Sequence, residues 1–156
     1  MPAKNAAAAA GDAAESPKSL YERDFYSWAL AQAALLRAGR FAEIDMANVA
    51  DELETLGRAE ASALGSSYRQ IVLHLLKWQY QPGRRAKDWK AAVLRERAHA
   101  ADVLETSPGL KPRKQELLAK AYQSARKEAA IETDLPMSTF PDACPFTLEQ
   151  VEDKRL

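Results

Sequence analysis

Apolar side chains recur three and four residues apart along most of the chain after residue 20, which is the spacing of one face of an α-helix. This spacing predicts a first helix over residues 21–39 and a second that starts after Asp45, with a break or kink at Gly57. A third helix, ended by Pro82 and Gly83, has the broadest apolar arc and is therefore expected at the centre of the fold. Its core stripe consists of Leu64, Tyr68, Ile71, Leu75 and Trp78, widened by Val72, Leu73, Leu76 and Tyr80.

Two further helices are predicted in the second half of the chain. Asp88 can cap a fourth helix, and Pro112 suits the first turn of a fifth. The predicted inner faces are Trp89, Val93, Ala100 and Leu104 in the fourth helix, and Leu118, Tyr122, Ala125 and Ala129 in the fifth.

The pattern changes after Asp134, where prolines alternate with apolar residues. Prolines prevent a regular helix, so an extended strap over the helices is expected. Thr147 and Gln150 then match a capping box for one last short helix. No segment alternates with period two. The chain is therefore predicted to be all-α, a compact bundle of about five helices with a proline-rich C-terminal strap and a short final helix.

The first nineteen residues contain eight alanines and no Leu, Ile, Val or aromatic residue. Such a segment has no apolar face to bury, so residues 1–19 are predicted to be a disordered tail. It resembles neither a secretory signal nor a transit peptide. Residues 20–156 are then expected to form a single helical-bundle domain.

The composition excludes several classes of protein. Lysine plus arginine and aspartate plus glutamate each number 22, and this zero net charge argues against a dedicated polyanion binder. No apolar stretch reaches the roughly 18 residues of a membrane span, so no membrane partner is expected. The single cysteine, Cys144, cannot form an internal disulfide, which favours a cytoplasmic location.

Charge is nevertheless uneven along the chain. Residues 43–54 contain five acids and no base, whereas residues 77–97 contain seven bases against Asp88 and Glu96. The basic stretch could contact nucleic acid, with Trp78 and Trp89 stacking on bases. Alternatively, both tryptophans are buried core residues, and the bases form a solvated face or pair with the acids of residues 43–54. The candidate binding residues are Lys77, Arg84, Arg85, Lys87 and Lys90.

His74 is the most suggestive single residue, because it lies at the edge of the core stripe in a polar row with Ser67, Gln70, Lys77 and Gln81. Its usual explanation is structural: the ring packs inward and its nitrogens bond a neighbouring helix. The alternative is catalytic. Arg69 precedes His74 with four residues between, a spacing that loosely resembles helical nuclease domains that act on RNA as dimers. There the histidine would exchange a proton while the arginine held the phosphate charge.

Carboxylate and histidine pairs elsewhere give no complete metal site. Glu96 and His99 have the Glu-x-x-His spacing of a bundle metal ligand pair, but one copy is not a site. Asp51 and Glu54 could hold Mg²⁺ only with further acids, so Glu54 is expected to pair with Arg58. Cys144 is expected to be an inert thiol. No metal or cofactor is therefore predicted, and the catalytic candidates, none assigned, are Arg69, His74 and Glu54.

Four segments resemble the bacterial family catalogued as domain of unknown function 29. They are YERDFYSWALAQAALLRAGRF, DELETLGR, HLLKWQYQP and FPDACPFTLEQV, in that order within residues 20–153. The resemblance implies a small cytoplasmic all-helical protein with no assigned activity, cofactor or partner. It also implies that a shared site would involve Glu54, Arg58, His74, Lys77, Trp78 and Pro82.

Two functions follow as hypotheses. The leading one is a non-enzymatic helical protein that acts through protein–protein contacts or self-association, with its uneven charge guiding the encounter. The alternative is an RNA-binding or RNA-cleaving bundle that uses Arg69, His74 and the basic stretch, although nucleic acid is not the favoured partner.

Overall fold

The computed structural model describes residues 19–153, and every regular element in that range is helical. This confirms the predicted all-α fold. The helices are α1 (Leu20–Arg23), α2 (Phe25–Arg37), α3 (Met46–Tyr80), α4 (Lys87–Thr106), α5 (Lys114–Thr133) and α6 (Leu148–Glu152). Short 3-10 turns lie between them at Phe41–Glu43, Pro82–Arg84, Pro108–Arg113 and Met137–Thr139. The tail predicted over residues 1–19 falls outside the described residues, except for Ser19, which caps α1.

The chain divides within α3 into two compact units, an N-terminal unit that ends at Glu52 and a C-terminal unit that begins at Leu53. Each is described by itself, and the single domain expected over residues 20–156 stays a prediction. None of the helices in residues 19–153 combines the length and the apolarity that crossing a bilayer requires.

The N-terminal unit is built around Trp28. This side chain is only 5% exposed, and its indole N–H donates to Oδ2 of Asp45 at 3.3 Å. The Tyr21 ring packs edge-on against Trp28 with centroids 4.7 Å apart. Asp45 also accepts the backbone N–H of Asn48 at 3.3 Å, which confirms Asp45 as the cap of the helix that follows.

The predicted helix over residues 21–39 is in fact two helices, because Asp24 interrupts it. Asp24 leaves the helical conformation with φ −153° and ψ 81°, and its carboxylate accepts the N–H of Ser27 at 3.0 Å. An aspartate bonded in this way caps a new helix, which the apolar spacing alone does not reveal. Gly39, with φ +69°, follows the end of α2 as predicted.

The predicted break or kink at Gly57 is wrong, since α3 runs without interruption from Met46 to Tyr80. A glycine costs only about 1 kcal/mol in a helix interior, which the surrounding helical residues can offset. The glycine is therefore tolerated rather than used as a stop.

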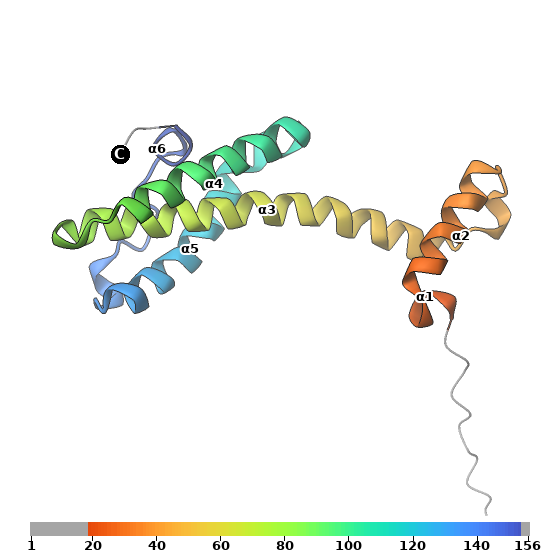
Figure 1. Cartoon of the computed structure of the whole chain (residues 1–156), viewed down its shortest axis with the longest axis horizontal. Helices are drawn as coiled ribbons and strands as arrows, with labels where there is room; N and C mark the ends of the chain where they lie inside the picture. The colour runs from red at the N-terminus through yellow and green to blue at the C-terminus, as the bar shows by residue number, and fades with distance from the viewer. Residues whose placement is uncertain (1–18, 154–156) are drawn as a thin grey trace, which may run out of the picture. The chain divides into compact units, whose positions relative to one another are not determined.

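The core of the C-terminal unit lies between the last five turns of α3 and the flanking α4 and α5 (Figure 1). Leu64, Tyr68, Ile71, Val72 and Leu76 are fully buried, which confirms the central position predicted for this stretch of α3. The predicted inner face of α5 is equally buried: Leu118, Tyr122, Ala125 and Ala129 are each 0% exposed.

The tryptophans at the α3–α4 turn differ from the prediction, because Trp78 and Trp89 are half-buried and not core residues. The fourth helix begins at Lys87, one residue before the predicted cap, and Ala86 caps it without a side-chain bond. Asp88 therefore lies in the first turn, where its negative charge interacts favourably with the positive end of the helix dipole. This places Trp89 in the first turn as well, at the end of the helix packing.

The C-terminal strap and α6 cover the core as predicted. Phe140 is 1% exposed, and the Tyr122 hydroxyl donates to the Pro141 carbonyl oxygen. Thr147 and Gln150 form both bonds of a capping box at the start of α6. Arg97 of α4 donates to the carbonyl oxygens of Val151 and Gln150 at 2.8 and 2.7 Å, so that the last turn of α6 is held as well.

Candidate functional site

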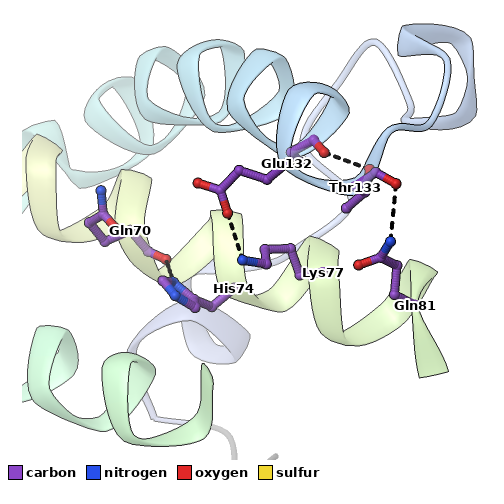
Figure 2. A network of polar contacts seen from close by, with 7 residues as sticks. Gln70, His74, Lys77, Gln81, Glu132 and Thr133 are labelled. Atoms are coloured by element: carbon purple, nitrogen blue, oxygen red, sulfur yellow. Dashed lines mark hydrogen bonds and ion pairs between the residues drawn. The ribbon is translucent and has the colours of Figure 1, made fainter. Parts of the chain in front are cut away.

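The polar row along the C-terminal half of α3 reaches α5 through Lys77 and Gln81 (Figure 2). Lys77 Nζ lies 2.6 Å from Oε2 of Glu132, and Gln81 Nε2 donates to the Thr133 carbonyl oxygen at 3.1 Å. The Lys77 side chain is only 13% exposed. These contacts fix the end of α5 to the end of α3, so that the row has a clear structural role.

His74 belongs to the same row, but its bond differs from the predicted one. Its Nδ1 lies 2.7 Å from the carbonyl oxygen of Gln70, one turn earlier in the same helix. A carbonyl oxygen only accepts, so Nδ1 carries the proton. The ring is half-buried and bonded to its own helix, not to a neighbouring one.

Arg69 has a different partner from His74. Its guanidinium forms an ion pair with Glu128 of α5, whereas His74 bonds the backbone of α3. Two residues five apart on a helix also project about 140° from each other. The structure therefore brings Arg69 to α5 but does not link it to the imidazole as a nuclease pair would need.

The other predicted residues are brought to two different places. Glu54 pairs with Arg58 at 3.2 Å, as predicted, and both side chains are largely exposed. Four exposed basic residues lie at the α3–α4 turn and in the first residues of α4: Arg84, Arg85, Lys87 and Lys90. Glu54 is thus separate from the polar row in the contacts it makes.

Each half-buried tryptophan at this turn carries a cation on its ring. The Arg85 guanidinium lies 4.9 Å from the centroid of Trp78, and Lys77 Nζ lies 4.8 Å from the centroid of Trp89. Arg85 Nε also donates to the Trp78 carbonyl oxygen at 3.0 Å. Lys77 consequently contacts side chains of both α4 and α5.

The sequence does not reveal that Ser67, Glu96 and His99 form one polar cluster. Ser67, 1% exposed, places its Oγ 3.2 Å from Glu96 Oε2 and 2.8 Å from His99 Nδ1. A hydroxyl donates only one proton, so when it donates to the carboxylate it must accept from the His99 Nδ1–H. The Glu-x-x-His spacing was the sequence signal for this cluster. Its two side chains provide hydrogen-bond partners for the buried Ser67 hydroxyl. Among residues 19–153 no group of three His, Cys, Asp or Glu side chains is placed to hold a metal ion.

A hollow of about 380 Å³ lies between α3 and α5 beside Gly65, lined by small residues, serine hydroxyls and two cations, Arg69 and Lys120. Each cation already has an acidic partner, Glu128 for Arg69 and Glu116 for Lys120 at 2.6 Å. Because both positive charges are locally neutralised, the hollow offers little attraction to an anion.

Cys144 lies in the strap and is half-buried, and its Sγ donates to the Phe146 carbonyl oxygen at 3.5 Å. Burial raises the pKa of this thiol. A raised pKa lowers the thiolate fraction at neutral pH, which agrees with the predicted inert thiol.

A family model described as "Domain of unknown function DUF29" matches residues 20–156 of the chain. No curated protein and no solved structure matches it.

Proposed function

The chain belongs to the DUF29 family, and we propose that it acts as a self-associating helical protein whose exposed apolar side chains bind a second copy. The observation that carries the proposal is the exposure of large apolar side chains in residues 20–46. Phe25, Tyr26, Leu30, Phe41 and Met46 are each at least half exposed, with values from 50 to 73%. Exposed apolar side chains gathered in one short segment are typical of an interface.

The small core of the N-terminal unit supports the same proposal. Within residues 19–52 only Trp28 and Ile44 are buried apolar side chains. Two buried apolar side chains make a small core, and such a core rarely stabilises a unit without further cover. A partner that covers the exposed side chains would supply that cover.

The first turns of α3 offer a face suited to a second copy. Leu53 and Leu56 are each 64% exposed and lie three residues apart, which places them on one face of the helix. A helix with one such stripe is complementary to itself about a two-fold axis, so an identical chain is the simplest occupant. Gly57 and other small residues beside the stripe permit close approach of the second helix.

Charge reversal within the stripe tests the proposal. Sedimentation velocity should show a dimer for the native chain and a monomer for the variant with Leu53→Glu and Leu56→Glu, because buried carboxylates without partners oppose association. The matched control carries Leu94→Glu and Ile131→Glu, which replace apolar residues that are 55 and 80% exposed elsewhere. The control should stay dimeric. If both variants and the native chain sediment alike, self-association through this stripe is wrong.

RNA binding or cleavage is the second candidate, and its two halves have unequal support. For cleavage, Arg69 and His74 have separate partners, Glu128 and the Gln70 carbonyl oxygen. For binding, the basic residues at the α3–α4 turn are exposed. An RNA-cleavage assay with His74→Ala and Arg69→Ala separates the two, because a cleaving pair requires both side chains.

A further inference from the structure

The α3–α4 turn carries positive charge that the rest of the described chain leaves unpaired. Arg84, Arg85, Lys87 and Lys90 fall within seven residues and are all exposed, and Asp88 is the only acid among them. Within residues 19–153 no ion pair joins any of these four bases to a carboxylate. By contrast, Lys77 and Arg69 are neutralised by acids of α5. The charge at the turn is therefore available to an anion.

Two indole rings lie among these bases. Trp78 precedes the turn and Trp89 follows it, and both are half-buried. The exposed Arg85 stacks on Trp78 at 4.9 Å, which joins a planar cation to an aromatic ring at the surface. Planar cations and aromatic rings beside basic side chains are the elements on which unpaired nucleic acid bases stack.

The four bases and two rings, named here the basic corner, favour one class of ligand. A membrane surface would need an apolar anchor beside the charges, and the exposed large apolar side chain next along α4 is the single Leu94, which is a small anchor by itself. An acidic protein would use the charges but not the stack that Arg85 and Trp78 form at the surface. We propose that the basic corner binds single-stranded nucleic acid. Its four basic side chains would contact phosphates, and Trp78 and Trp89 would lie beside the nucleobases of the strand.

Because the chain has zero net charge, no general positive field of the protein adds to the attraction at the basic corner. Four phosphate contacts on a single strand give a slope of about −3 in log K against log salt concentration. The binding is thus expected to be weak at physiological salt and clear at low salt. It does not depend on self-association, so the variant with Leu53→Glu and Leu56→Glu should bind the strand like the native chain.

Fluorescence anisotropy of a labelled oligouridylate, titrated with the full chain over a salt series, tests the proposal. Replacing Arg84 and Lys87 by glutamate should weaken binding at least tenfold at low salt. The matched control replaces two exposed bases elsewhere, Lys111→Glu and Lys127→Glu, and should bind within twofold of the native chain. Far-UV circular dichroism checks that every variant stays folded.

A second readout reports the rings themselves. Binding should quench tryptophan fluorescence, and the variant with Trp78→Phe and Trp89→Phe should lose this quenching, because the remaining Trp28 is buried. Equal weakening by the control, no oligouridylate binding at low salt, or a salt slope near zero would each overturn the proposal. So would displacement of the strand by polyglutamate at equal charge, which would mean an acidic protein ligand, or binding to anionic vesicles without oligouridylate binding.

Discussion

Lys77 of α3 and Glu132 of α5 form an ion pair of 2.6 Å, and the ammonium of the same lysine lies 4.8 Å from the Trp89 ring of α4. One side chain thus joins all three long helices of the C-terminal unit. Because Lys77 is only 13% exposed, solvent screens this pair less than it screens the surface pairs.

Replacing Lys77 by methionine should lower the free energy of unfolding. The substitution keeps an apolar stem but removes the ion pair and the cation–π contact, which together cost about 1 to 2 kcal/mol. Urea denaturation measures the change. Arg58→Met is the matched control, because it breaks the exposed pair with Glu54 and should cost no more than about 0.5 kcal/mol. Equal losses in the two variants would deny Lys77 its joining role.

Gly57→Ala should stabilise the protein. Residue 57 lies inside the continuous α3, and a Cβ atom there would meet nothing within 4 Å. Alanine then gains about 0.5 to 1 kcal/mol over glycine through its helix propensity. Thermal or urea unfolding gives the sign directly. A loss of stability would indicate that the helix is bent at this position after all.

Tyr68→Phe should destabilise the C-terminal unit. Tyr68 is 0% exposed and its hydroxyl donates to Glu152, the last residue of α6. Loss of a hydrogen bond to a charged group costs about 1.5 to 3 kcal/mol. The control is Tyr26→Phe, since Tyr26 is 73% exposed and should tolerate the change. Equal unfolding midpoints for the two variants would contradict the assignment.

Alkaline pH should weaken the fold through two tyrosines. Burial, followed by the hydrogen bond to Glu152, raises the pKa of Tyr68 above its ordinary value, and burial raises the pKa of Tyr122 to about 12. A raised pKa in the folded state means that the unfolded chain loses its protons first, so stability falls as pH rises above about 10. Urea midpoints across that range check the prediction. The Tyr68→Phe variant should show a shallower fall, and a flat profile in the native chain would refute it.

The sequence predicted the fold well where local pattern decides. The stripes of α3 and α5, the Asp45 cap and the capping box of Thr147 all depend on neighbours within one or two turns. The wrong predictions concern residues that can play either of two roles, and apolar spacing does not distinguish between those roles. Asp24 could continue a helix or cap the next one, and Gly57 could end a helix or remain inside it.

The candidate site was predictable only as a set of residues. The polar row of α3 follows from helical spacing, but the partners of Lys77 and Arg69 lie more than fifty residues away on α5. Such pairings depend on how the helices pack, which one sequence does not reveal. Apolar spacing places Trp78 and Trp89 in the core. In the structure both are half-buried, because they lie where the packing of α3 and α4 ends.

Light scattering during size-exclusion chromatography, over a dilution series of the native chain, tests the central claim most directly. Self-association of identical chains predicts a mass near twice 17.2 kDa at high concentration, falling toward 17.2 kDa on dilution. A mass of 17.2 kDa at every concentration would contradict it.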